Sequence, residues 1–214
     1  METRAFNISL EKNALISIKV IPGHFTTVNA HTNNYLDVSR LKSNSLVARD
    51  VARELAIPYR SSVLVDTIVC MEGTEVIGAY MAEELLQEGT SVINEGGEIY
   101  VVTPLHNISG KLIFNDSVIE WITGKNIILL VASISSGQTI KSAMECLSYY
   151  GGRLAGISAL FISSHDRLEQ KINALFSSDD IPGYKLFSAA ECEMCKAGLK
   201  LDAIISSEGY TKIG

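Results

Sequence analysis

One uninterrupted apolar run constrains the fold of this chain more than any other feature. Residues 127–131 are Ile, Ile, Leu, Leu and Val, with no polar position among them. A run of this length with no polar face is typical of a strand that is buried on both sides of a parallel sheet. The sequence therefore predicts a buried parallel strand over Asn126 to Ala132, among the middle strands of its sheet.

The segments around this run alternate between strand and helix patterns. Further strands are predicted at 66–70, 98–102 and 154–162, and helices at 44–56, 74–87 and 138–150. This alternation predicts an α/β fold, with a central parallel sheet flanked by helices and connected by right-handed crossovers. Ligands of such sheets bind at the carboxyl ends of the strands. The stretch 103–116 has no clear periodicity and is long enough to form an active-site lid.

Composition and charge limit the class of protein. The 214 residues carry a formal net charge of −6, and 47% of them are hydrophobic, which is enough for a sizeable core. No dense cluster of Lys and Arg indicates a nucleic-acid surface, and no apolar window of about 18 residues could cross a membrane. The N-terminus lacks the apolar core of a secretory signal, and Cys70 and Cys146 lie in apolar patterns typical of buried thiols. We therefore expect a cytoplasmic protein with neither nucleic acid nor membrane as its partner.

A loop rich in hydroxyl groups follows the central strand. Gly137 permits an unusual backbone angle, and the first N–H groups of the next helix point toward one spot, where a phosphate is stabilised. The candidate phosphate-binding residues are Ser135, Ser136, Gly137, Gln138 and Thr139. A plain Ser/Thr helix cap is the alternative that the local chemistry leaves open.

The stretch Ile127 to Ile140, IILLVASISSGQTI, resembles the phosphoribosyl pyrophosphate signature of the type I phosphoribosyltransferases. The family pattern is four apolar residues, two aspartates, two apolar residues, Thr-Thr-Gly-Gly-Thr and an apolar residue, and the match has no gap. The resemblance implies that the loop holds a 5′-phosphate. The family's two acids, which hold the ribose hydroxyls, are replaced here by Val131 and Ala132, whose side chains accept no hydrogen bond.

Two further stretches are similar to the orotate phosphoribosyltransferases within this family. GHFTTVNAHTNNYLD, at 23–37, matches their pattern at Phe25, Tyr35 and Asp37, and the resemblance implies that Phe25 and Tyr35 lie in a base pocket. IVCMEGTEVIGA, at 68–79, resembles their pyrophosphate loop. That loop holds Glu72, Gly73, Thr74 and Glu75 here.

Glu75 departs from the family pattern, because a glycine is expected at its position. A carboxylate beside a diphosphate is repelled by about 1 kcal/mol at about 4 Å in water, and by more in a drier site. The alternative is that Glu75 begins the following helix, where an acid is favoured by the helix dipole.

The predicted lid, VVTPLHNISGKLIF at 101–114, resembles the family's catalytic loop. That loop carries an Arg-Lys pair, another Lys and a His, which help to stabilise the leaving pyrophosphate. The matching positions are Val101, Val102, Leu105 and Asn107. His106 lies one place away and is the remaining candidate catalytic residue.

The sequence Cys192-x-x-Cys195-x-x-Gly198 resembles the tail of many orotate enzymes. A zinc site needs four ligands, and no second pair stands near these cysteines in the sequence, so we expect no metal here. A redox pair is a second alternative, and a structural tail is the interpretation that we favour.

The resemblance covers most of the chain, about 23–201, and implies a single domain. Residues 44–184 would form its core, and residues 1–43 with 185–214 would form a hood and tail. The altered acids and lid cations favour a protein that binds a nucleotide or another 5′-phosphorylated molecule without efficient transfer. The alternatives are an active phosphoribosyltransferase, with Mg²⁺ as its only expected cofactor, and a scaffold without a ligand. The mean hydropathy of +0.20 and the resemblance predict a homodimer.

Overall fold

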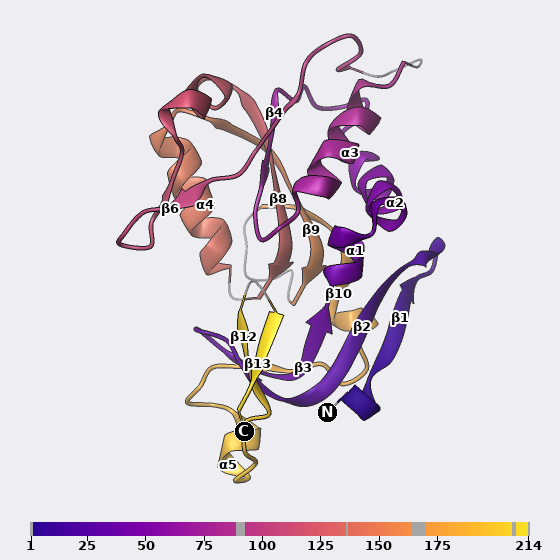
Figure 1. The fold of residues 1–214 in the computed structure, drawn as a ribbon, viewed down its shortest axis with the longest axis vertical. Helices are drawn as coiled ribbons and strands as arrows, with labels where there is room; N and C mark the ends of the chain where they lie inside the picture. The colour runs from indigo at the N-terminus through magenta and orange to yellow at the C-terminus, as the bar shows by residue number, and fades with distance from the viewer. Residues whose placement is uncertain (1, 89–92, 136, 164–169, 207–208, 214) are drawn as a thin grey trace.

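Two sheets organise the chain, one above the other in Figure 1. The computed structural model describes residues 2–88, 93–135, 137–163, 170–206 and 209–213. Both ends of the chain lie in the lower sheet, and the middle of the chain forms the upper one.

The upper sheet has five strands, and every pairing within it is parallel. Its strands run in the order β10 (Ile172–Ser177), β9 (Arg153–Ile162), β8 (Asn126–Ile134), β4 (Thr67–Cys70) and β5 (Tyr100–Val102). The strand predicted from the apolar run is β8, and it lies in the middle. The predicted α/β fold with a central parallel sheet is confirmed.

Alternate side chains of β8 point into two separate clusters of buried residues. Ile128 and Leu130 pack in one cluster with α2 (Ser45–Ala56) and α3 (Glu75–Leu86). Leu129 and Val131 pack in the other with α4 (Gln138–Tyr149). The strand is therefore covered on both faces, which explains why its sequence has no polar alternation.

The lower sheet is built from both ends of the chain. Its strands run in the order β11 (Leu186–Phe187), β3 (His31–Asp37), β2 (Asn13–Thr26), β12 (Ala203–Ser206) and β13 (Gly209–Lys212), and β1 (Phe6–Leu10) also pairs with β2. β2 forms antiparallel ladders with β1 and β3 and a short parallel one with β12. Ile16, Ile18 and Val20 of β2 share a buried cluster with the helices of the upper sheet. Part of β2 therefore belongs to the same buried core as the helices that cover the upper sheet.

The remaining elements are short. They are the helices α1 (Ser39–Ser43) and α5 (Glu193–Lys196), the 3₁₀ turns at Glu2–Arg4, Asp116–Trp121 and Ser178–Asp180, and the hairpin β6 (Leu105–His106) and β7 (Leu112–Ile113). The predicted lid coincides with this hairpin. Among the described residues, no helix combines the length and apolar character that crossing a membrane requires.

Gly78 provides a test of the packing between α3 and the sheet. A methyl group at this position would overlap Cys70 Sγ and would lie 3.2 Å from Val101 Cγ1. Alanine is favoured over glycine inside a helix by about 1 kcal/mol, but overpacking costs about 1–3 kcal/mol. We expect Gly78→Ala to lower the free energy of unfolding, measured by denaturant titration.

The exposed neighbour Ala79 supplies a control on the same helix. Ala79→Gly should cost about 1 kcal/mol through helix propensity alone. The double variant Gly78→Ala, Cys70→Ala removes the sulfur and should recover part of the loss. A Gly78→Ala chain that is more stable than the native one would contradict this close packing.

Candidate functional site

A cleft of about 290 Å³ lies between the carboxyl ends of the parallel strands and the lower sheet. The floor of the cleft comes from the ends of β4, β8 and β9 and the start of α4, and α1 forms one side. The roof comes from the turn between β2 and β3 and from the end of the chain. The lining residues used below are Ala30, Thr32, Tyr35, Lys42, Glu72, Ala132, Ser133, Ser135, Gly137 and Thr139.

The predicted phosphate loop forms part of this floor. Ser135, Gly137 and Thr139 line the cleft, whereas Gln138 is exposed at the first turn of α4 and does not. Ser136 lies outside the described residues. Gly137 has a φ of 77°, in the left-handed region where a side chain would be strained. Because Gly137 and Thr139 line the cleft, the start of α4 faces it with its partial positive charge.

The two positions that replace the family's acids point in opposite directions. Ala132 lines the cleft. Val131 is fully buried and packs in the core against the other face of the sheet. Only Ala132 is therefore placed to meet a ligand through its side chain.

Glu72 is the acidic residue among the described lining residues, and it lies beside these two positions. Its Oε2 accepts a hydrogen bond of 3.1 Å from the backbone N–H of Ser133. Its backbone has a φ of 58°, unusual for a residue with a side chain. Burial raises the pKa of the Glu72 carboxyl above its ordinary value of 4.5, although the bond from Ser133 and the charge of Lys42 oppose that shift.

Lys42 is the cation among the described lining residues, and sequence reasoning missed it. It lies on α1, and its Nζ donates a 2.7 Å hydrogen bond to the backbone carbonyl of Glu72. The sequence around it matches no phosphate-binding motif. Only the packing of α1 against α2, α3 and β2 brings this charge to the cleft.

The other residues of the predicted pyrophosphate loop have structural roles or face away from the cleft. Thr74 is buried, and its Oγ1 donates to the carbonyls of Met71 and Leu130. Gly73 is exposed, with a φ of 77°. Glu75 is the first residue of α3, and its carboxylate accepts a hydrogen bond from Thr103 Oγ1. This placement agrees with the alternative in which Glu75 begins the helix.

The two base-pocket candidates differ in whether their side chains reach the cleft. Tyr35 lines the cleft, and burial raises the pKa of its hydroxyl to about 12. Phe25 is fully buried and does not line it. The Phe25 ring packs beneath the Tyr35 ring, with 6.1 Å between their centroids. Phe25 is therefore placed to support Tyr35 rather than to contact a ligand.

His106 lies away from the cleft. It is exposed on the β6–β7 hairpin and is not among the lining residues. The structure therefore does not bring the candidate catalytic histidine to the phosphate loop.

A second group of reactive side chains lies outside the cleft. Cys192 and Cys195 meet His24 and His31, and one ligand atom from each residue lies within 4.8 Å of all the others. The sequence-based expectation of no metal rested on the lack of a second pair of ligands near the cysteines. The fold supplies that pair from β2 and β3, which are about 160 residues away in the chain.

Comparisons with known proteins agree with the fold. No family model matches the chain. The chain is 27% identical over 195 residues to an orotate phosphoribosyltransferase of Wolinella succinogenes, covering 85% of this chain and 88% of that protein. It is 21% identical over 195 residues to the enzyme of the same name from Chlorobaculum parvum, covering 86% and 88%.

Solved structures with the same architecture have low sequence identity to this chain. UMP synthase of Leishmania donovani has a TM-score of 0.54 at 20% identity, over 74% of this chain but only 33% of that longer one. Orotate phosphoribosyltransferase of Mycobacterium tuberculosis has a TM-score of 0.51 at 11% identity, over 75% and 90%.

The raised pKa of Glu72 predicts a pH dependence of stability. A carboxyl whose pKa is higher in the folded state binds more protons when folded, so stability falls as pH rises above the ordinary value of 4.5. Glu72→Gln removes this titration and keeps an acceptor oxygen. We expect the variant to gain stability relative to the native chain between pH 4.5 and neutrality, measured by thermal unfolding at several pH values. Glu75→Gln on the neighbouring helix is the matched control, and an equal gain in both variants would contradict the prediction.

Proposed function

We propose that the cleft of this chain, which is similar in sequence to the orotate phosphoribosyltransferases, binds a nucleotide or another 5′-phosphorylated molecule. We further propose that it transfers phosphoribosyl groups weakly or not at all. One observation carries the proposal: Ser135, Gly137 and Thr139 of the predicted phosphate loop line the cleft, while Ala132 stands beside them at one of the positions where the family that this chain resembles has an acid.

The phosphate half of the site has the features that an anion requires. The left-handed turn at Gly137 leads into α4, whose first N–H groups are favourable to negative charge. The hydroxyl groups of Ser135 and Thr139 line the same space. Lys42 also lines the cleft and adds a positive charge. Together these groups favour a phosphate as the ligand.

The rest of the cleft is unfavourable to phosphoribosyl pyrophosphate. That substrate brings a diphosphate in addition to the 5′-phosphate, and in the family that this chain resembles its ribose hydroxyls are held by two acids. Here Ala132 offers no oxygen, and Glu72 is already bonded to the backbone of Ser133. Each missing charged hydrogen bond costs about 1.5–3 kcal/mol, or about ten- to a hundredfold in affinity.

An active transferase is the second candidate, and the position of Glu72 favours it. The Glu72 carboxylate lies against the backbone next to the lost acids, so it could take over their contact with the ribose or with Mg²⁺. In that case Glu72→Gln would abolish transfer. In the binding proposal the same change removes only a negative charge from an anion site and tightens phosphate binding.

The test is a titration of the native chain with uridine 5′-monophosphate, and with phosphoribosyl pyrophosphate plus Mg²⁺, followed by calorimetry. We expect the nucleotide to bind and phosphoribosyl pyrophosphate to bind at least about tenfold more weakly. Lys42→Met should weaken nucleotide binding by about ten- to a hundredfold, because it removes the charged partner of the phosphate. Lys111→Met, an exposed lysine in the β6–β7 loop, is the matched control.

A transfer assay with orotate, phosphoribosyl pyrophosphate and Mg²⁺ distinguishes the candidates. Turnover that Glu72→Gln abolishes would establish the enzyme and contradict the proposal. Ala132→Asp restores an acid that faces the cleft, and should increase Mg²⁺-dependent binding of phosphoribosyl pyrophosphate. Val131→Asp is unsuitable, because it would place a charge in the core. A chain that binds neither ligand would favour the scaffold without a ligand.

We also propose that the chain forms a homodimer in the cytoplasm. Its four cysteines are free, which fits a reducing compartment. Its mean hydropathy is +0.20, and large apolar side chains such as Leu46, Ile108 and Tyr149 are exposed. Such surface tends to be buried between subunits. Sedimentation velocity at micromolar concentration should give the mass of two chains, and a single 23.2 kDa species would contradict the proposal.

A further inference from the structure

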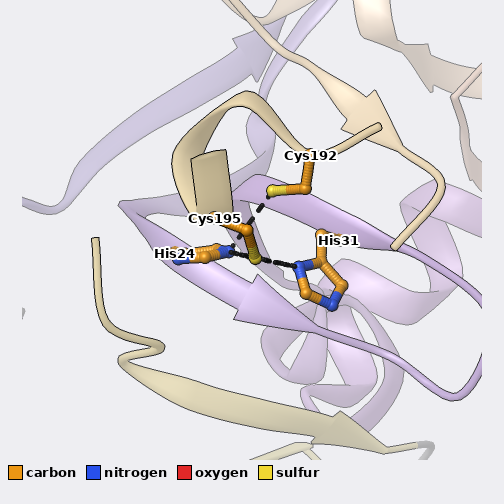
Figure 2. A group of neighbouring side chains, drawn as sticks. All are labelled: His24, His31, Cys192 and Cys195. Atoms are coloured by element: carbon orange, nitrogen blue, oxygen red, sulfur yellow. Dashed lines mark hydrogen bonds between the residues drawn. The ribbon is translucent and has the colours of Figure 1, made fainter. Parts of the chain in front are cut away.

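Four side chains of the metal-binding types meet beside β2 and β3 of the lower sheet. Figure 2 shows His24 from β2 and His31 from β3 pointing at Cys192, which immediately precedes α5, and at Cys195, which lies within it. His24 and Cys192 are buried, His31 is partly buried and Cys195 is exposed. The group is therefore shielded from solvent at His24 and Cys192 and open to solvent at Cys195.

The distances within the group are those of a tetrahedral metal site. His24 Nε2 lies 3.2 Å from His31 Nδ1, 3.5 Å from Cys192 Sγ and 3.6 Å from Cys195 Sγ. Cys195 Sγ lies 3.3 Å from His31 Nδ1. Zinc bonds of about 2.3 Å to sulfur and about 2.0–2.1 Å to nitrogen place tetrahedral ligands about 3.4 Å (nitrogen to nitrogen) and about 3.6 Å (nitrogen to sulfur) apart. The observed spacing leaves room for one such ion at the centre.

A hydrogen bond on the far side of one ring fixes the nitrogen that faces the group. His24 Nδ1 lies 3.0 Å from the backbone carbonyl of Leu199, which can only accept. Nδ1 therefore carries the proton, and the lone pair of Nε2 points at the two sulfurs and at His31. A histidine that ligates a metal commonly donates its other N–H to a carbonyl in this way, which sets the orientation of the ring.

The backbone around His24 is held by the same tail that supplies the cysteines. The His24 N–H donates to Asp202 Oδ2 at 2.8 Å, and the His24 carbonyl accepts from the Asp202 N–H at 2.7 Å. A Cβ at Gly23 would approach that carboxylate oxygen to 2.6 Å, so this tight pairing needs glycine. Gly198, at a φ of 73°, turns the chain after α5 so that the Leu199 carbonyl meets His24. The position of His24 is thus set independently of any contact with the cysteines.

We propose that these four residues bind one Zn²⁺ in a closed, structural site. Two thiolates and two neutral imidazoles neutralise the charge of the ion, and tetrahedral Cys₂His₂ coordination is a preferred environment of zinc. All four positions are filled by protein, so no position is left for water or substrate. The site acts by holding parts of the chain together and takes no part in chemistry.

The ion would connect the roof of the cleft to the tail. His31 lies between Ala30 and Thr32, both of which line the cleft, and the cysteines lie in the segment that follows β11. Fixing His31 to this segment restricts the movement of the roof. Zinc is therefore expected to stabilise the fold and to support ligand binding, whichever ligand the cleft takes.

The first experiment measures metal in the purified native chain by mass spectrometry of its elements. We expect one equivalent of zinc per chain. Replacement by Co²⁺ should give the strong visible bands of tetrahedral cobalt together with sulfur-to-cobalt charge transfer, because two thiolates bind it. Both signals should be lost in Cys195→Ser and His31→Ala. They should remain in the matched controls Cys146→Ala and His106→Ala, which alter a cysteine and a histidine outside the group.

A second measurement uses only the native chain, so its result does not depend on whether a variant folds. A strong zinc chelator should lower the melting temperature of the native chain by about 5–10 °C, and added Zn²⁺ but not Mg²⁺ should restore it. Reduced native chain that carries no zinc and gives no tetrahedral cobalt spectrum would overturn the proposal. A Cys192–Cys195 disulfide in the chain as isolated under non-reducing conditions, with zinc absent, would overturn it in favour of a redox pair.

Discussion

Burial of β8 on both faces is the constraint on which the rest of the structure depends. A strand with no solvent-facing side must satisfy its backbone through neighbouring strands on both sides, which are parallel here, and must bury its side chains under elements above and below, which are helices here. The chain can therefore leave this layer only at the ends of the strands. At its carboxyl end β8 runs directly into the left-handed turn at Gly137 and the start of α4. The anion-favouring end of the helix is thus a direct consequence of how the core is covered.

The cleft above that edge has an unusual balance of charge. Its described lining includes one carboxylate and one ammonium group, and Lys42 is tied to the backbone of Glu72. The two charges are therefore positioned by one another as well as by the sheet. A ligand that enters the cleft must compete with this local arrangement for the ammonium group of Lys42.

The sequence predicted four of the five strands of the upper sheet, but it missed β10 at the edge of that sheet and most of the lower sheet, for a physical reason. The residues at 127–131 bury both faces of one strand, so their pattern depends on nothing remote. β2 is long, partly exposed and bent by an irregular register near Pro22, and its partners come from both ends of the chain. The local pattern of apolar and polar residues cannot predict pairings between segments that are so far apart in the sequence.

The same distinction applies to the site residues. The loop at 135–139 was predictable, because a strand, a glycine and a helix stand in sequence. Lys42 and the pair His24 and His31 were not, because each acquires its neighbours only through packing. Val131 shows the limit of motif matching: its position in the signature is clear, but only the alternation of β8 reveals that its side chain faces the core. Phe25 likewise matched a pattern and proved to be buried under Tyr35.

The pairing of Ala203 with Phe25 has a consequence for how the molecule acquires its shape. The upper sheet joins segments that follow one another closely along the chain, so it can assemble while later residues are still being made. The lower sheet has to close a loop of nearly the whole polypeptide, and contacts of such long sequence separation form slowly. The ribosome must release residues beyond 200 before β12 can join β2. Until then the cleft lacks the part of its roof that comes from Ile205, Ser206 and Gly209, although the turn between β2 and β3 has long been made.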